Sequence, residues 1–331
     1  MRKSLVAVFC AAGLLGGIGL SSPAASLDKP DGFPERPLTI IVPYGAGGGS
    51  DQLTRAMAAS LEKVIGVGVQ VVNKPGGGGM AAVPDFMTAP ADGYTLLESI
   101  DDAVTNHVSG KLKENPGEDW TPVAMAQITF SQIYIRPDDD RFSDWESFVA
   151  YAKANPGQVK MANLGNRGSM ERVTMLKVEQ SSGIETNQIA FDKPAERYGA
   201  LIGGHVDALF EQPGDVRNFL DAGQMKPIIT FLKERPSAFA NTPAMTDVGA
   251  DFEPLLRFRG FWLHPDVPED RRAYLEAAFK EAWASDSFQE FNEKKYMNLI
   301  DSYRDTAGSK ELIQGAIDTY TAVYKEIGLI E

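Results

Sequence analysis

Cysteine is nearly absent from the sequence. The single one, Cys10, lies in the N-terminal segment 1–26, and no cysteine follows it. Loss of that segment would exclude disulfides, thiol nucleophiles and thiolate metal ligands from the rest of the chain. Histidine is almost as scarce, because His107, His205 and His264 are scattered without metal-ligand spacing. We therefore expect no metal site, no catalytic residue and no cofactor.

The N-terminal segment has the features of an export signal. Arg2 and Lys3 precede an uncharged apolar run from Leu5 to Leu20, and small residues surround the expected cleavage points after Ala24 or Ser26. This order is typical of a secretory signal peptide. The run is too short to span a bilayer comfortably as a permanent helix. The sequence therefore predicts that the segment is cleaved and that the mature chain works in the periplasm.

Positive charge is also in deficit. The chain has 32 Lys and Arg against 45 Asp and Glu, a net charge of −13 that becomes −15 once Arg2 and Lys3 are removed. This balance opposes nucleic acid and anionic membrane surfaces as partners. An anionic ligand is still possible, since a site can be locally rich in donors. The remaining length, a little over 300 residues, suggests two domains with enough core to fold without disulfides.

The sequence after residue 27 alternates between strand and helix patterns. A β-rich run at Leu38–Val42 is followed by a glycine cluster, and then Leu53, Met57, Leu61 and Ile65 recur at helical spacing. Similar units follow along the chain. Alternation of this kind predicts an α/β fold with mixed, mostly parallel sheets.

The absence of a Gly/Ser linker indicates that strands join the two expected lobes. We predict crossings near residues 124–132 and 246–258. The expected division is residues 27–128 plus 250–331 for lobe 1 and residues 129–249 for lobe 2.

Two glycine-rich loops, at residues 45–51 and 163–169, each lie between a strand and a helix. Glycines let a ligand approach the backbone, and free N–H groups at a helix start attract anions. The first loop matches neither a Walker loop nor a dinucleotide fingerprint. It is also compatible with a plain turn in which Ser50 or Asp51 caps the helix. Arg167 in the second loop suits a carboxylate, although a solvated surface arginine is an equally good interpretation.

Six ordered segments resemble the substrate-binding receptors of tripartite tricarboxylate transporters, also called Bug receptors. The resemblance covers nearly the whole mature chain, roughly Pro34 to Gly328. The segments are Pro37–Asp51, Asn73–Gly79, Ala91–Leu97, Asp119–Val123, Ala162–Ser169 and Gly203–Ala208. The resemblance implies a two-lobed periplasmic-binding-protein (Venus-flytrap) fold, type II-like, that closes on a small organic acid. It also implies a monomer that works with membrane permease subunits and is not an enzyme.

The resemblance further implies where the ligand binds. In that family, backbone groups and waters at the two glycine loops hold a carboxylate, and two strand ends line the rest of the cleft. The expected ligand-binding residues are Tyr44, Gly47, Gly48, Gly49, Ser50, Glu98, Ser99, Asp101, Asn163, Gly165, Asn166, Arg167, Gly168, Ser169, Phe191 and Glu211. Ser50 and Ser169, at helix starts on opposite walls, are each expected to donate to a ligand carboxylate.

Two segments depart from the family pattern at the distal end of the ligand, so the substrate does not carry over. Residues 98–102 (Glu-Ser-Ile-Asp-Asp) and 191–194 (Phe-Asp-Lys-Pro) replace smaller or different residues. Asp102 is also placed to cap the next helix. An ionised Glu98 or Asp101 in a closed cleft would repel the second charge of a dicarboxylate. We therefore predict a ligand whose far end is hydroxylated, aromatic or cationic.

The predicted function is a periplasmic receptor that delivers a small carboxylate to a membrane permease. Two alternatives remain open at this stage. One is a receptor that reports to a membrane signalling partner, and the other is an α/β enzyme that uses the first glycine loop for a phosphorylated substrate.

Overall fold

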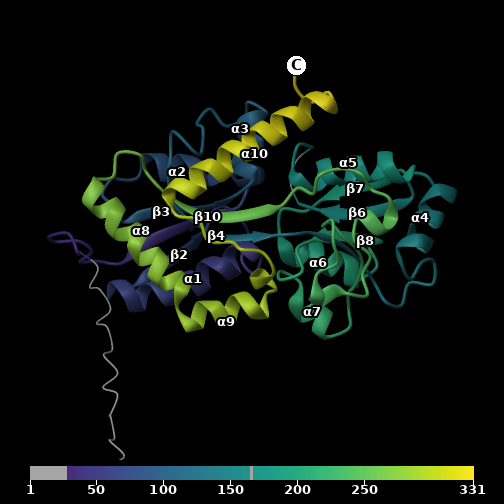
Figure 1. Ribbon diagram of the computed structural model, residues 1–331, viewed down its shortest axis with the longest axis horizontal. Helices are drawn as coiled ribbons and strands as arrows, with labels where there is room; N and C mark the ends of the chain where they lie inside the picture. Colours follow the sequence, from purple (N-terminus) through teal and green to yellow (C-terminus); the bar gives the residue numbers. More distant parts are fainter. Residues whose placement is uncertain (1–27, 165–166) are drawn as a thin grey trace, which may run out of the picture.

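The computed structural model describes residues 28–164 and 167–331 and contains two α/β lobes side by side along its long axis (Figure 1). The predicted signal peptide and the candidate residues Gly165 and Asn166 lie outside the described residues. Across the two described ranges, no helix is long and apolar enough to cross a membrane.

The first lobe is built on a five-stranded sheet in the order β2-β1-β3-β10-β4. Strands β1, β2 and β3 are parallel, and β10 runs antiparallel to both β3 and β4. The strands are β1 (Leu38–Val42), β2 (Val69–Asn73), β3 (Thr95–Ile100), β4 (Thr121–Thr129) and β10 (Arg257–Leu263). The helices are α1 (Gly49–Ile65), α2 (Val83–Thr88), α3 (Asp102–Val108), α8 (Glu269–Ala284), α9 (Asp286–Lys294) and α10 (Thr306–Glu326), with 3-10 turns η1 (Gly77–Ala82) and η4 (Met297–Leu299).

The second lobe repeats this arrangement with the order β7-β6-β8-β5-β9. Strands β6, β7 and β8 are parallel, and β5 is antiparallel to β8 and β9. The strands are β5 (Gln132–Ile135), β6 (Val159–Asn163), β7 (Thr186–Ala190), β8 (Ala208–Glu211) and β9 (Lys226–Thr230). The helices are α4 (Trp145–Ala154), α5 (Met170–Ser182), α6 (Pro194–Ile202) and α7 (Arg217–Asp221), with 3-10 turns η2 (Ser237–Phe239) and η3 (Thr246–Val248).

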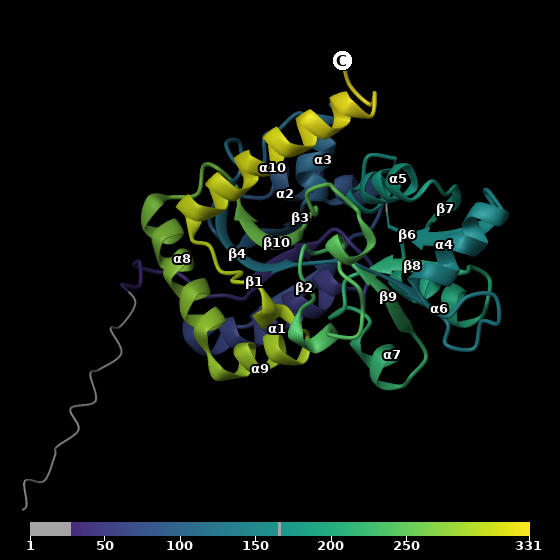
Figure 2. The ribbon, with the colours of Figure 1, turned by 45° about the vertical axis from the view of Figure 1, so that its right-hand side comes forward.

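The chain crosses between the sheets at two places. Strand β4 belongs to the first sheet and β5 to the second, so the first crossing falls at Phe130 and Ser131. The return crossing follows β9 and is mostly loop and 3-10 turn, and a strand begins only at Arg257. Figure 2 shows how β4 and β10 bring the first sheet up to the second lobe.

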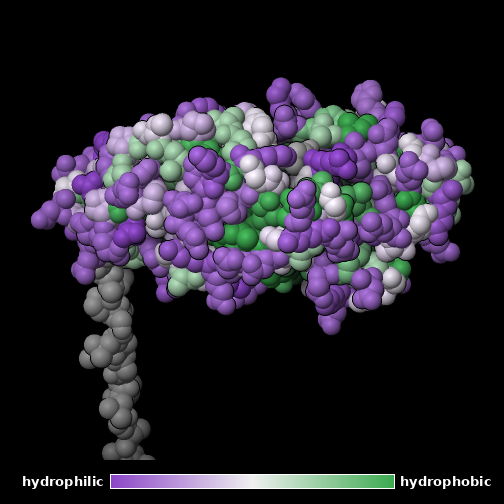
Figure 3. Space-filling model, turned by 90° about the horizontal axis from the view of Figure 1, so that it is seen from above, coloured by the Kyte–Doolittle hydropathy of each residue, from purple (hydrophilic) through white to green (hydrophobic). Residues whose placement is uncertain are grey.

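Hydrophobic side chains cover both faces of the first sheet. Helices α1 and α8 pack on one face through residues such as Leu53 and Phe279. The other face packs against α2, α3 and α10, and there Trp120 meets Phe86 and Trp262 edge to face, with centroids 5.6 and 6.4 Å apart. On the face seen in Figure 3, hydrophilic side chains cover most of the surface, and a group of hydrophobic ones lies near the middle of the long axis.

The helical prediction for α1 is confirmed, because all four apolar residues at spacing four are buried and Gly66 ends the helix in the left-handed conformation, with φ 77°. Helix α1 follows β1, and α5 follows β6. In an open α/β sheet, ligands bind beyond the carboxyl ends of such strands. The two helix starts therefore lie where the lobes meet.

Candidate ligand-binding cleft

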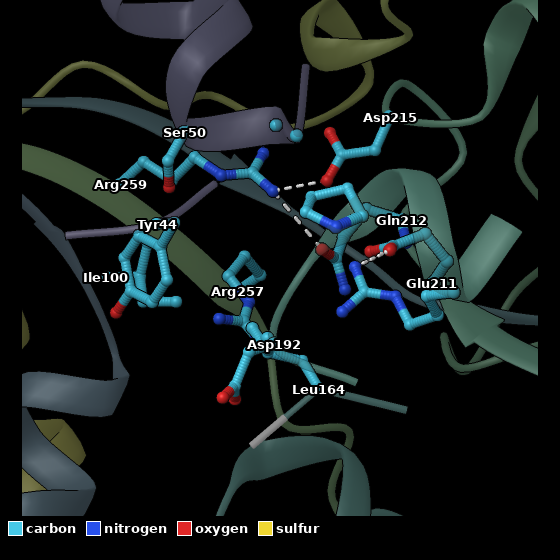
Figure 4. A pocket seen from close by; sticks show the side chains of 14 residues that line it. Tyr44, Ser50, Ile100, Leu164, Asp192, Glu211, Gln212, Asp215, Arg257 and Arg259 are labelled. Atoms are coloured by element: carbon cyan, nitrogen blue, oxygen red, sulfur yellow. Dashed lines mark hydrogen bonds and ion pairs between the residues drawn. The ribbon is translucent and has the colours of Figure 1, made fainter. Parts of the chain in front are cut away.

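A small cavity lies between the lobes, and residues from both line it (Figure 4). Its volume is about 30 Å³, which is room for little more than a water molecule. The two lobes are thus closed on each other. The lining residues are Tyr44, Gly48, Gly49, Ser50, Ile100, Arg257 and Arg259 from the first lobe and its return strand, and Leu164, Asp192, Pro194, Arg197, Glu211, Gln212 and Asp215 from the second.

Glycines at the start of α1 allow the second lobe to approach closely. Gly48 is the N-cap residue, without a side-chain cap, and a Cβ on it would lie 2.6 Å from Pro194 Cγ. A Cβ on Gly49 would overlap both the Arg259 guanidinium and the Asp215 carboxylate. The interpretation of Ser50 or Asp51 as the N-cap is wrong, since Asp51 instead accepts a hydrogen bond from Gly47 N (2.9 Å).

Arg259 on β10 forms an ion pair between the lobes. Its Nη2 donates to Asp215 Oδ2 of the second lobe at 2.5 Å and to Gln212 Oε1 at 3.2 Å. Its Nη1 donates to Gln127 Oε1 of the first lobe at 3.1 Å. Arg259 and Asp215 are both buried. In Figure 4 the guanidinium extends under Ser50 towards Asp215 and Gln212, so a lobe-2 carboxylate occupies the N-terminus of α1, where an anion is favoured.

Arg257, two residues earlier on β10, lies among three acids. Its Nε is 3.2 Å from Asp101 Oδ1, its Nη1 is 4.0 Å from Asp102 Oδ1, and its Nη2 donates to Glu171 in the first turn of α5. Tyr320 on α10 also donates to Asp101 Oδ2 at 3.4 Å. Burial raises the pKa of Asp101 and Asp102, while the Arg257 charge opposes the rise.

A third buried ion pair stays within the second lobe. Arg197 on α6 donates to Glu211 at the end of β8, and the Tyr198 hydroxyl donates to the same carboxylate at 3.0 Å. Arg197 Nη1 also donates to the Phe191 carbonyl at 3.5 Å. Glu211 thus has its own cation and does not depend on the first lobe.

Glu98 is buried beneath the start of α1. Neither of its carboxyl oxygens makes a hydrogen bond of good geometry within the described residues. Burial raises the pKa of Glu98 to about 8, although the nearby Ser50 hydroxyl, Arg259 and Arg257 lower it in part. Burial thus favours the protonated form of the Glu98 carboxyl group at neutral pH in the closed form.

The cavity brings together only part of the predicted site. Tyr44, Gly48, Gly49, Ser50 and Glu211 line it. The other described candidates are not among the residues that line it: Gly47, Glu98, Ser99, Asp101, Asn163, Arg167, Gly168, Ser169 and Phe191. The candidates Gly165 and Asn166 lie outside the described residues.

The surroundings of three of these candidates show why their side chains do not line the cavity. Asp101 lies against Arg257, which does line the cavity. The Ser169 hydroxyl donates to the Leu164 carbonyl at 2.9 Å, so in the closed form it is not free for a ligand. Arg167 is exposed.

The residues that sequence analysis missed are mostly charged ones brought together by tertiary contacts. These are the charged Arg197, Asp215, Arg257 and Arg259, together with Gln212 and Leu164. The other unlisted lining residues, Ile100, Asp192 and Pro194, lie in the two segments assigned to the distal end of the ligand. One signal was present, because Arg257 and Arg259 alternate with apolar residues in a strand, and both therefore point to the same face.

The fold and the cleft are those of a two-lobed solute-binding protein. The family description "Tripartite tricarboxylate transporter family receptor" matches residues 53–329. The chain belongs to this receptor family, which confirms the resemblance and the fold predicted from the sequence.

Known relatives agree with this assignment. The chain is 28% identical to Protein BugT of Bordetella pertussis over 242 residues, which cover 71% of this chain and 74% of that protein. Its fold is similar to the structure of MatC from Rhodopseudomonas palustris with bound malate (TM-score 0.78, 23% identity, 88% of this chain and 99% of that one). It is also similar to an R. palustris protein with adipate (TM-score 0.79, 19% identity, 89% and 98%).

Proposed function

We propose that this chain is a periplasmic receptor that captures a small organic carboxylate between its lobes and delivers it to the permease of a tripartite tricarboxylate-type transporter. The observation that carries the capture step is Arg259 at the start of α1. The only acid within ion-pair distance of it among the described residues, Asp215, comes from the other lobe. Opening of the lobes would leave Arg259 with the neutral Gln127 amide and free to bind an anion.

Three physical contributions favour a carboxylate at this place. A guanidinium forms strong charge-assisted hydrogen bonds to carboxylates. The N-terminus of α1, a helix of 17 residues, adds unpaired N–H groups and a favourable dipole. Closure then removes water, which strengthens both interactions. Malate and adipate in the similar structures are acids of the expected size.

Native mass spectrometry of the protein purified from the periplasm of its own host tests capture directly. We expect a bound mass that matches a small organic acid, and an intact chain that begins at Ala25 or Leu27 after signal cleavage. A protein that carries no acid, and whose melting temperature responds to no organic acid, contradicts the proposal.

Delivery needs a separate experiment. Cells that lack this receptor should lose uptake of the identified acid and regain it when the chain is restored. Intact uptake together with a lost transcriptional response to the acid would favour the signalling alternative instead.

A further inference from the structure

The charged groups of the closed cleft are unequally divided between acids and bases. Among the described residues around the cavity, three buried arginines stand beside six buried acidic side chains, of which Glu98 has a pKa that favours its neutral form at pH 7. The arginines are Arg197, Arg257 and Arg259, and the acids are Glu98, Asp101, Asp102, Glu171, Glu211 and Asp215. Each arginine already has an acidic partner. None of these three arginines is therefore left over for a second carboxylate of a ligand.

The place that suits the ligand's first carboxylate is the one that Asp215 occupies. The Asp215 carboxylate lies against Gly49 at the start of α1 and accepts from Arg259. A ligand carboxylate that binds Arg259 Nη2 at the start of α1 takes this position, and Asp215 then loses its ion pair.

The side chains around Asp215 offer it little compensation after this exchange. Glu211 repels it and is paired with Arg197. Lys295, at the end of α9, lies beyond ion-pair distance, and burial lowers its pKa even though Asp215 opposes that change. Gln52 contacts only the Asp215 carbonyl, at 3.5 Å. A buried carboxylate without a counterion is strongly disfavoured.

We propose that the ligand is a small zwitterion whose carboxylate takes the place of Asp215 at Arg259 and α1, and whose cationic group then pairs with Asp215. This inference rests on the proposed function and narrows the ligand class. A zwitterion satisfies Arg259 and Asp215 together. A dicarboxylate would place its second charge among Asp215, Glu211 and the exposed Asp192, where like charges repel each other.

A set of acids of matched chain length tests this. Pentanoate, glutarate and 4-aminobutyrate each join a carboxylate through three methylenes to a methyl group, a second carboxylate or an ammonium group. Norvaline is pentanoate with the ammonium on the carbon beside the carboxylate. Titration calorimetry on the full mature protein, with the set repeated at two and four methylenes, should show a zwitterion that binds at least tenfold more tightly than the matched methyl and dicarboxylate acids.

The Asp215→Asn variant locates the preference. It should lose at least tenfold in affinity for the zwitterion and bind glutarate more tightly than wild type, because the competing carboxylate is gone. Asp221→Asn is the matched control, since Asp221 forms an exposed ion pair with Arg217 in the same lobe. It should leave all affinities unchanged.

The outcomes separate the two proposals. Tightest wild-type binding of glutarate or pentanoate overturns the zwitterion and leaves carboxylate capture standing. Binding of none of the acids at any length overturns both. Both of these outcomes are measured on the wild-type protein, so they test the zwitterion proposal even if Asp215→Asn does not fold. A preference for zwitterions that Asp215→Asn leaves unchanged overturns the role of Asp215.

Discussion

Arg257 and Arg259 lie two residues apart on one strand and point to the same face, but different lobes supply their counterions. Arg257 keeps Asp101 of its own lobe beside it and reaches Glu171 in the other. The single acid at Arg259, Asp215, belongs to the second lobe. Opening of the lobes therefore leaves Arg257 neutralised and Arg259 unpaired. The first arginine is suited to stability and the second to ligand capture.

The largest effect should appear at Arg257. Arg257→Gln would leave Asp101 and Glu171 buried without their cation, and loss of one partner of a buried pair destabilises by about 3–5 kcal/mol. Urea denaturation at pH 7 measures this loss in the free energy of unfolding. Arg259→Gln should lose less, because Asp215 regains water when the lobes open. Equal losses of unfolding free energy in the two variants would mean that Arg257 is no more important for stability than Arg259.

Ligand affinity should show the reverse order. Arg259→Gln removes the cation at the start of α1 and should weaken binding of the cognate acid by about 2–5 kcal/mol. Calorimetry with the acid identified by mass spectrometry checks this, and Arg257→Gln should lose less. Arg36→Gln, which removes an exposed pair with Asp92, is the control and should bind as wild type does. A greater loss of affinity in Arg257→Gln than in Arg259→Gln would mean that Arg257, and not Arg259, is the arginine that captures the ligand.

The pH dependence of stability should reveal Glu98, which lies near Arg259. Its pKa is raised to about 8 in the folded state, mainly by burial, so the folded protein binds one more proton than the unfolded chain between about pH 4.5 and 8. The stabilisation of the folded protein that comes from protonated Glu98 is full below about pH 4.5. It is lost as the pH rises towards 8, at up to about 1.4 kcal/mol per pH unit.

Denaturant midpoints measured from pH 5 to 8 test this. Glu98→Gln should flatten the fall in stability relative to wild type. Glu118→Gln, at an exposed acid, should leave the slope as it is. A slope that is unchanged in Glu98→Gln would mean that Glu98 is ionised in the folded protein.

The smallest effect should come from Gly49, where both Arg259 and Asp215 touch the helix start. Gly49→Ala adds a methyl group that keeps Asp215 from Arg259, so the ligand-free protein should open and its radius of gyration should rise in X-ray scattering. Affinity should fall about tenfold, or ~1.4 kcal/mol. Gly315→Ala, at a helical glycine with open space around it, should change neither quantity.

Local pattern was enough to predict the scaffold of the cleft. The glycine cluster between a strand and a helix predicted Gly48, Gly49 and Ser50 as ligand-binding residues, and all three line the cavity. A turn of this kind is encoded within a few residues. Ordered motifs along the whole chain identified the family for the same reason. The sequence also predicted a crossing near residues 124–132, and in the structure the chain leaves one sheet for the other at Phe130 and Ser131.

The charge network could not be predicted in the same way. Arg259 pairs with Asp215 across 44 positions, and Arg257 pairs with Glu171 across 86. In sequence, an arginine that alternates with apolar residues looks like one on the solvent side of a strand. Contacts with Asp215 and Gln212 of the second lobe, far away in the sequence, help to bury Arg259. The same network holds Asp101 beside Arg257, a partner that the sequence did not indicate.

The closed lobes also bear on how fast a ligand is captured. A cavity of about 30 Å³ cannot admit an organic acid, so entry must wait until the Arg259–Asp215 and Arg257–Glu171 pairs separate. Association is then gated by a conformational step, and the pre-existing open state is the one selected. In stopped-flow mixing, the observed rate should level off with rising ligand concentration at the opening rate, instead of rising to the diffusion limit.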